Sequence, residues 1–182
     1  MAVGVFLAEG FEEIEALTVV DLLRRAGIET RMVSVTSHKQ VTGSHQIPVV
    51  TDTLLEEVDF GQMEMIVLPG GMPGTLGLEA CKPLIEQVKS FHAMGKPIAA
   101  ICAAPTILGR LGLLEGRVAC CYPGMEKELT GAQVTQAAVA KEDNLITSRG
   151  MGTAIDFSLS IIEQFKGSQA AGEMAEKIVY LR

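Results

Sequence analysis

An apolar strand runs directly into a cysteine and then into the start of a helix in the stretch Lys96-Pro97-Ile98-Ala99-Ala100-Ile101-Cys102-Ala103-Ala104-Pro105-Thr106. A sharp strand-to-helix turn pushes the sulfur out of the sheet edge and points the first free N–H groups of the helix at it. Beside a helix N-terminus or a cation, the pKa of a thiol falls from ~8.5 to about 3.5–7.5. The stretch therefore predicts a nucleophilic thiol at Cys102, although most buried cysteines are inert.

Strand and helix patterns alternate on both sides of this junction. Short apolar runs predict strands at residues 3–8, 30–35, 65–68, 97–101, 118–121, 134–139 and 145–147, with a hairpin or edge element at 41–50. Amphipathic spacing predicts helices at residues 12–26, 82–93, 103–111, 154–165 and 169–181. This alternation is typical of an α/β fold with a mostly parallel central sheet covered on both faces. No linker or repeat interrupts it, so one domain is expected over residues 1–182.

Composition excludes several classes of function. The net charge is −7 and no basic cluster is present, which argues against nucleic-acid or anionic-membrane binding. The longest apolar stretch, residues 97–109, is too short to span a bilayer, and the first residues indicate a strand rather than a signal peptide. Four cysteines without C-x-x-C spacing predict neither a zinc site nor a disulfide framework, so we expect a cytoplasmic protein without a metal.

Three segments are expected at the carboxyl ends of parallel strands, where ligands bind in such sheets. They are residues 10–15, residues 69–74 and Cys102. The acidic run Glu12-Glu13-Ile14-Glu15 suits a helix N-terminus by itself, because carboxylates complement the helix dipole. Its apolar neighbours nevertheless place Glu15 on the strand side, with Glu12 and Glu13 facing water. A buried Glu15 has a raised pKa and can exchange a proton with a thiolate.

The glycine loop Gly70-Gly71-Met72-Pro73-Gly74 is by default a turn. It has neither a Walker A pattern nor a dinucleotide fingerprint, so no nucleotide cofactor is expected. An unobstructed N–H at Gly71, beside that of Ala103, would form an oxyanion hole. None of the three histidines lies next to the cysteine in sequence, which favours a carboxyl partner over an imidazole.

Four motifs together resemble the DJ-1/PfpI superfamily, and most closely its ThiJ-type, DJ-1-like branch. They are Ala-Glu-Gly-Phe-Glu-Glu-Ile-Glu-Ala (8–16), Ile-Val-Leu-Pro-Gly-Gly (66–71), Ala-Ala-Ile-Cys-Ala-Ala-Pro (99–105) and Thr-Ser-Arg-Gly-Met-Gly-Thr-Ala (147–154). The resemblance implies a flavodoxin-like three-layer sandwich that forms a homodimer. It also implies that Cys102 is a nucleophile-elbow cysteine, that Glu15 is its acid partner, and that Gly71 and Ala103 supply the oxyanion N–H groups.

The chain departs from the pattern of its relatives at two positions, and a third separates it from the protease-like branch. Many relatives place a histidine before a proline near the cysteine, where this chain has Tyr122-Pro123, and a phenol is a weaker base than imidazole at neutral pH. Where relatives place an arginine, the aligned residue is His45, which weakens an anion pocket completed by Arg25 and its neighbours at a dimer interface or makes it pH-dependent. The protease-like branch carries a histidine directly after the cysteine, and Ala103 there argues against peptidase activity.

The resemblance implies three activities: a glyoxalase that converts 2-oxoaldehydes such as methylglyoxal without glutathione, a deglycase of early glycation adducts, and an oxidation-sensing or chaperone-like protein. The leading hypothesis is the enzyme, with Cys102 as nucleophile, Glu15 as acid and base, and a pocket that includes Gly70, Tyr122, His45 and Arg25. The rival is a redox sensor in which Cys102 is oxidised to the sulfinate. A third reading is a binding protein with an ordinary thiol.

Overall fold

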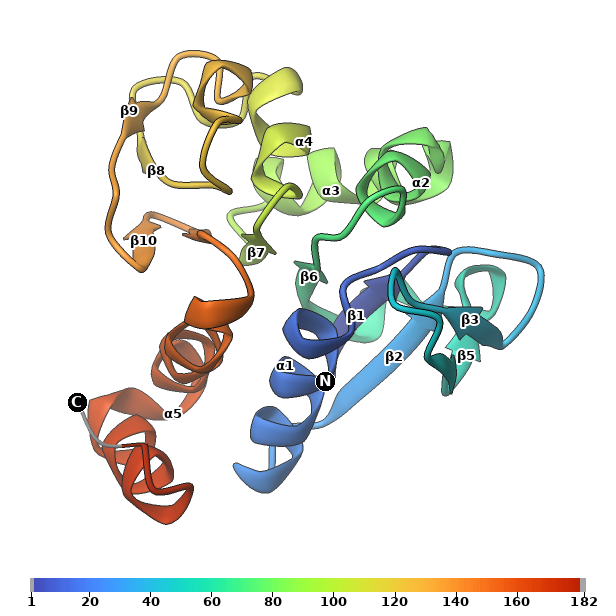
Figure 1. The fold of residues 1–182 in the computed structure, drawn as a ribbon, viewed down its shortest axis with the longest axis horizontal. Coiled ribbons are helices and arrows are strands. Elements are labelled where there is room, and N and C mark those ends of the chain that lie inside the picture. The colour runs from blue at the N-terminus through green and yellow to red at the C-terminus, as the bar shows by residue number, and fades with distance from the viewer. Residues whose placement is uncertain (1, 181–182) are drawn as a thin grey trace.

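The computed structural model describes residues 2–180 and shows a seven-stranded sheet with helices on both faces (Figure 1). The strand order is β10-β11-β7-β6-β1-β2-β5, and every neighbouring pair is parallel except β10 and β11. This is the flavodoxin-like α/β sandwich that the alternating pattern and the family resemblance predict.

The elements have the following bounds. The main sheet contains β1 (Ala2–Leu7), β2 (Thr30–Ser34), β5 (Thr53–Leu54), β6 (Met63–Leu68), β7 (Ile98–Ile101), β10 (Val139–Glu142) and β11 (Leu145–Ser148). Two small sheets pair β3 (Gln40–Thr42) with β4 (Pro48–Val50), and β8 (Val118–Ala119) with β9 (Gln133–Val134). The helices are α1 (Glu13–Arg25), α2 (Gly74–Ala80), α3 (Lys82–Ala93), α4 (Pro105–Arg110) and α5 (Ala154–Lys177).

Alternate residues of the central strands enter two hydrophobic cores. Val5 and Leu7 of β1 pack in the core beneath α1 and α5, which lie side by side over one face (Figure 1). Phe6 points the other way, into the core that contains Leu84 and Phe91 of α3. Because successive side chains of a strand point to opposite faces, a sheet covered on both sides needs such continuous apolar strands.

The strand predicted at residues 134–139 is wrong. Val134 ends β9 in a small sheet, and Val139 begins β10 at the edge of the main sheet. Between them the hydroxyl of Thr135 accepts a hydrogen bond from the N–H of Ala137 at 3.2 Å, which turns the chain. An apolar run therefore spans two strands because its two ends pair with different partners.

The two C-terminal helices predicted from sequence correspond to the two halves of α5. Gly167, with φ 83° and ψ 168°, interrupts the helical backbone between them. The second half ends at Lys177, and the predicted end at Leu181 lies outside the described residues. Between residues 2 and 180, no helix combines the length and the apolar character that crossing a bilayer requires.

Helix α2 was not predicted. It begins directly after the glycine loop, and Gly74 and Gly77 lower its helix propensity. Tertiary packing compensates, because Leu78 is fully buried in the core beneath α3. The helix fixes the end of the loop that carries Gly70 and Gly71.

Candidate active site

Cys102 occupies the sharp turn between β7 and α4. Its φ is 65°, a left-handed conformation that costs a non-glycine residue about 1–2 kcal/mol. Two backbone hydrogen bonds hold this conformation: Cys102 N–H donates to the carbonyl of Ser148 at 2.9 Å, and Tyr122 N–H donates to the carbonyl of Cys102 at 2.7 Å. The side chain is partly exposed, in the elbow geometry expected of a nucleophile.

Glu15 approaches the cysteine from the first turn of α1. The carboxylate of Glu12 caps this helix by accepting the N–H of Glu15 at 2.7 Å. The Glu15 side chain faces the sheet, is only 1% exposed, and accepts the N–H of Gly70 at 2.9 Å. Burial raises the pKa of Glu15 to about 7, although a hydrogen bond with Cys102 opposes the shift.

The thiol does not have the lowered pKa that the strand-to-helix junction predicts. Burial and the neighbouring Glu15 carboxylate raise the pKa of Cys102 to about 12, while the N–H groups of Gly71 and Ala103 act in the opposite direction. Helix α4 begins only at Pro105 and has six residues, so its dipole is weak at the sulfur. Between these two pKa values Cys102 and Glu15 together carry one negative charge, which resides mainly on Glu15.

The glycine loop brings its backbone into direct contact with this pair. A Cβ on Gly70 would lie 2.5 Å from the Cys102 Cβ and 2.6 Å from Glu15 Oε2. Gly71 has φ 93°, and a Cβ there would collide with the backbone of Glu12. Only glycines allow the Gly71 N–H to reach the sulfur opposite that of Ala103. Two converging N–H groups can stabilise an oxyanion that forms beside the cysteine.

An open cavity of about 400 Å³ lies over the sulfur. It is lined by Gly71, Met72, Cys102, Ala103, Tyr122, Pro123, Gly124 and Met125. The predicted pocket residue Tyr122 is 51% exposed and lines this cavity. A Cβ on Gly150 would lie 3.5 Å from the Tyr122 ring and 3.9 Å from Glu15 Oε1, so Gly150 leaves space between these two side chains. Sequence reasoning missed Met72 and Met125. The only signal in the sequence was their position, directly after a glycine pair and a Pro-Gly turn.

His45 does not line this cavity. Its Nδ1 lies 3.0 Å from Glu13 Oε2, and its backbone N–H donates to Glu13 Oε1 at 2.7 Å. The expectation that Glu13 faces water is therefore wrong: the β3–β4 hairpin covers it, and the residue is 4% exposed. Glu12, Glu13 and His45 bring ligand atoms within 4.8 Å of one another, but the Glu13 oxygens already accept hydrogen bonds from Ser44 and His45. The arrangement ties the hairpin to α1.

Arg25 lies at the far end of α1. Ten residues of helix place it roughly 15 Å along the axis from Glu15. Its guanidinium pairs with Asp21 at 2.7 Å on the surface. Arg25 therefore lies outside the cavity over Cys102 of its own chain, and its contribution to an anion pocket at a dimer interface stays a prediction.

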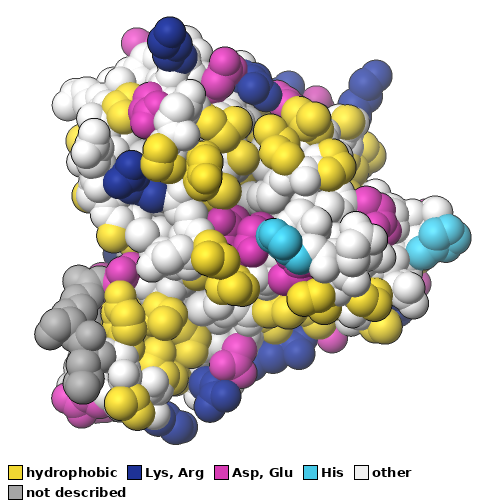
Figure 2. All heavy atoms as spheres, viewed as in Figure 1, with side chains coloured by type: hydrophobic (Ala, Val, Ile, Leu, Met, Phe, Trp, Pro, Cys, Tyr) yellow, Lys and Arg dark blue, Asp and Glu magenta, His cyan; other side chains and the backbone are white. Residues whose placement is uncertain are grey.

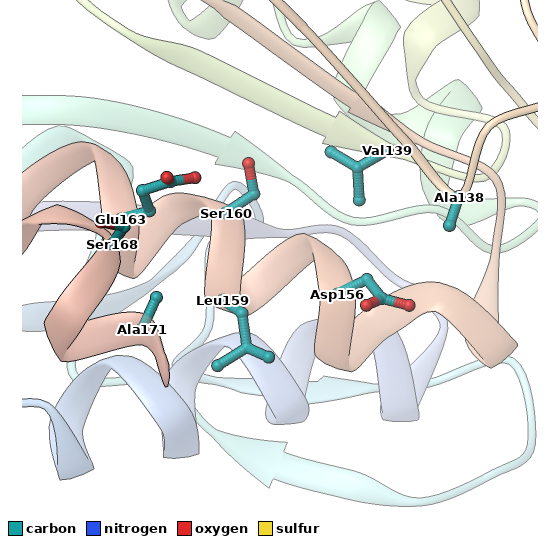
Figure 3. Close-up of a pocket in the computed structure, with 8 residues that line it drawn as sticks. All are labelled: Ala138, Val139, Asp156, Leu159, Ser160, Glu163, Ser168 and Ala171. Atoms are coloured by element: carbon teal, nitrogen blue, oxygen red, sulfur yellow. The ribbon is translucent and has the colours of Figure 1, made fainter. Parts of the chain in front are cut away.

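A second cavity, of about 390 Å³, lies where α5 is interrupted (Figure 3). Ser160 and Glu163 project from the same side of the helix, and the other lining residues are Ala138, Val139, Asp156, Leu159, Ser168 and Ala171. These residues, all in the described part of the chain, include no cysteine, histidine or lysine. Among residues 2–180, a nucleophile, an acid and converging N–H groups occur together only at Cys102.

The space-filling view shows the face of the molecule that is also seen in Figure 1. Hydrophobic side chains gather on the upper part of this face, with acidic side chains and a histidine at its centre (Figure 2).

Comparison with known proteins identifies the family. A model described as the DJ-1/PfpI family matches residues 1–164. The chain belongs to the DJ-1/PfpI family. Protein DJ-1 homolog B of Arabidopsis thaliana is 40% identical over 175 residues, which cover 95% of this chain and 40% of that protein. The chain therefore spans less than half the length of this relative.

Two further relatives match over nearly their full length. Glutathione-independent glyoxalase DJR-1.2 of Caenorhabditis elegans is 32% identical over 171 residues, or 93% of this chain and 91% of the relative. The structure of oxidized Toxoplasma gondii DJ-1 has a TM-score of 0.95 and 35% identity, covering 100% of this chain and 99% of that one. The family resemblance predicted from four sequence motifs is confirmed.

Proposed function

We propose that this protein is a glutathione-independent glyoxalase that converts 2-oxoaldehydes into 2-hydroxy acids. The observation that carries the proposal is the coupled pair of Cys102 and Glu15, with the N–H groups of Gly71 and Ala103 directed at the sulfur. The Caenorhabditis elegans relative named as a glutathione-independent glyoxalase supports the reaction class.

The first step forms a hemithioacetal. The proton that the pair shares moves to Glu15, and the Cys102 thiolate attacks the aldehyde carbon, so that a C–S bond forms and the carbonyl π electrons move to oxygen. The N–H groups of Gly71 and Ala103 stabilise this oxygen, which then takes the proton from Glu15. A thiol pKa near 12 does not prevent the step, because attack needs only the minor tautomer in which Glu15 holds the proton.

The second step is an internal redox reaction. The Glu15 carboxylate removes the proton from the former aldehyde carbon and returns it to the adjacent ketone carbon through an enediol. The first carbon is thereby oxidised to a thioester and the second is reduced to an alcohol. Water then attacks the thioester, releases the 2-hydroxy acid and regenerates the thiol.

The test is lactate formation from methylglyoxal by chelator-treated protein without glutathione. We expect turnover in the wild type and a loss of about 1,000-fold or more in Cys102→Ser. Cys81→Ser, at a partly exposed cysteine outside the cavity, serves as the matched control and should retain activity. Absence of lactate, or equal rates for Cys102→Ser and wild type, contradicts the proposal.

A deglycase activity on early glycation adducts would use the same thiol. The rate of amine release from the adduct distinguishes the two activities. A glyoxalase consumes only free aldehyde, so amine release in its presence cannot be faster than the spontaneous dissociation of the adduct. Amine release from a methylglyoxal-treated peptide faster than this dissociation would show direct deglycation.

The second candidate function is oxidation sensing. A partly exposed Cys102 Sγ with two N–H donors and Glu15 beside it can hold a sulfinate. A relative, Toxoplasma gondii DJ-1, is described in an oxidized form, which favours this candidate. Two equivalents of hydrogen peroxide would transfer two oxygens to the sulfur and leave two waters. Intact-mass measurement after mild peroxide should show two added oxygens in wild type and none at this site in Cys102→Ser. Retained function of the oxidised protein favours the sensor, and loss of turnover favours the enzyme.

We also propose that the chain forms a homodimer through the face that carries α1 and the β3–β4 hairpin. Ile14 of α1 and Ile47 of the hairpin are 49% and 52% exposed, which leaves apolar side chains on neighbouring elements. Light scattering after gel filtration should give twice the chain mass of 19.4 kDa, and Ile14→Glu should lower it. A wild-type monomer would contradict the proposal.

A further inference from the structure

We propose that the cavity over Cys102 selects 2-oxoaldehydes whose ketone carries an uncharged, apolar substituent larger than methyl, such as an aryl or branched alkyl group. This inference rests on the proposed glyoxalase function and assigns specificity to Met72, Met125 and Tyr122. It follows from the lining of the cavity, from its attachment to the elbow and from the direction in which a bound substrate must extend.

The lining is apolar beyond the reacting atoms. Met72, Tyr122, Pro123 and Met125 supply its side chains, while Gly71, Ala103 and Gly124 leave space between them. The lining residues, all within the described chain, include no lysine, arginine or histidine to balance a carboxylate or phosphate. Glu15 lies beneath the cavity and Glu12 lies close enough to raise its pKa, so an anionic substituent would meet like charge.

The segment Tyr122–Met125, which lines part of the cavity, is hydrogen-bonded to the backbone of Cys102. Tyr122 N–H donates to the Cys102 carbonyl at 2.7 Å, and Met125 N–H donates to the Tyr122 carbonyl at 3.1 Å. Pro123 and Gly124, the latter with φ 92°, occupy the two central positions of this turn, as a type II turn prefers. The turn therefore presents Tyr122 and Met125 at a fixed position relative to the sulfur.

The opposite wall is fixed by the glycine loop. Glu12 N–H donates to the Gly70 carbonyl at 2.9 Å, and Gly70 N–H donates to Glu15 Oε2 at 2.9 Å. Met72 follows two positions later and is 49% exposed at the cavity. Its unbranched, polarizable side chain can adapt to substituents of different shape.

The reacting atoms determine where the substituent goes. The aldehyde oxygen faces the N–H groups of Gly71 and Ala103, and the two reacting carbons must face the buried Glu15 carboxylate. The remaining group on the ketone carbon therefore points outward, between Met72 and the Tyr122–Met125 turn. A volume of about 400 Å³ lies in the range of pockets that hold whole small ligands, and a methyl group leaves most of it unfilled.

The experiment compares kcat/KM for phenylglyoxal and methylglyoxal in wild type and in the double variant Met72→Ala, Met125→Ala. For each protein we take the ratio of kcat/KM for phenylglyoxal to that for methylglyoxal. Comparing this ratio between wild type and variant removes the difference in intrinsic reactivity of the two aldehydes. We expect the preference for phenylglyoxal to fall at least tenfold, as the loss of apolar contacts predicts. Met94→Ala, at an exposed methionine that ends α3, is the matched control and should leave the preference unchanged.

Two outcomes separate this inference from the proposed function. Turnover of both aldehydes with an unchanged preference in the double variant overturns the inference and leaves the glyoxalase intact. If wild type turns over neither aldehyde, the proposed function fails, and binding of acetophenone to protein with ¹³C-labelled methionine methyl groups decides the inference. Shifts confined to the signals of Met72 and Met125 support it, and no shift at these two methionines overturns it.

Discussion

Glu13 and Glu15 lie two residues apart in the first turn of α1, and both are almost fully buried, at 4% and 1% exposure. Their pKa values nevertheless move in opposite directions. Burial raises the pKa of each carboxyl, but hydrogen bonds from the side chain and the backbone N–H of His45 outweigh burial at Glu13 and lower its pKa. At Glu15 the opposing hydrogen bonds, from Cys102 and Gly70, are too few, and the pKa rises to about 7.

The difference teaches that the partners of a buried carboxyl, and not burial itself, decide what it can do. Glu13 is an anion at neutral pH, and it holds the β3–β4 hairpin against the helix. The pKa of Glu15 is about 7 and its neighbour is a thiol. A carboxyl with such a pKa can both accept and donate a proton at physiological pH.

The largest expected effect comes from Glu15→Gln, which removes the proton carrier and keeps the shape. Because general acid–base catalysis contributes about 10²–10⁴-fold, kcat for methylglyoxal should fall by that factor. Glu13→Gln is the matched control on the same helix turn and should lose much less. Equal losses for the two variants would break the functional contrast between these carboxyls.

The pH dependence sharpens the contrast further. Below about pH 7, Glu15 and Cys102 are both protonated. A protonated Glu15 cannot accept the thiol proton, so no thiolate forms. We therefore expect kcat/KM to rise tenfold per pH unit toward about pH 7 and then to level. The levelling near pH 7 should persist in Glu13→Gln, whereas in Glu15→Gln the rate should keep rising past pH 7 because the thiol itself then titrates. Levelling near pH 7 in Glu15→Gln would assign that ionisation to another group.

The two substitutions should change stability with opposite signs. The folded pKa of Glu15 is raised, so the folded state loses roughly 3 kcal/mol of stability as pH rises from the ordinary carboxyl pKa to about 7. Glu15→Gln escapes this loss and should be about 1–3 kcal/mol more stable than wild type at pH 8.

Glu13→Gln should instead be less stable by about 1–3 kcal/mol, because its amide N–H₂ cannot accept the hydrogen bonds that His45 donates. The pKa of Glu13 is lowered, so this difference is present at neutral pH and shrinks as the pH falls through that value. Urea unfolding at pH 5 and pH 8 measures both signs, and the same sign for the two variants would refute the comparison.

The smallest effect is expected for His45→Ala. Hydrogen bonding to Glu13 raises the pKa of His45, whose contribution to stability is therefore complete below its ordinary pKa and is lost as pH rises through the folded value. The side chain is exposed, so the change should be slight and larger at pH 5.5 than at pH 9. Thermal unfolding at the two pH values tests this, and a loss confined to pH 9 would be inconsistent with it.

The spacing of apolar residues predicted the α/β sandwich, because buried strands and amphipathic helices each have a characteristic periodicity of apolar residues along the sequence. It also predicted that Glu15, Gly71 and Ala103 meet Cys102, because parallel strands bring their carboxyl ends to one edge. The predictions that failed did so for non-local reasons: Glu13 is covered by a hairpin about 30 residues away, residues 134–139 divide between two sheets, and burial beside Glu15 raises the pKa of the Cys102 thiol.

The sequence by itself determined the fold, the elbow at Cys102 and the choice of a carboxyl partner, since all three depend on spacing along the chain. Only the tertiary structure decided the protonation of that site. The pKa of the thiol depends on burial and on the Glu15 charge, and the fates of Glu13 and Glu15 depend on which distant N–H groups reach them. Electrostatic energies depend on distances through space, and these are set when the sheet, the hairpin and the glycine loop pack together.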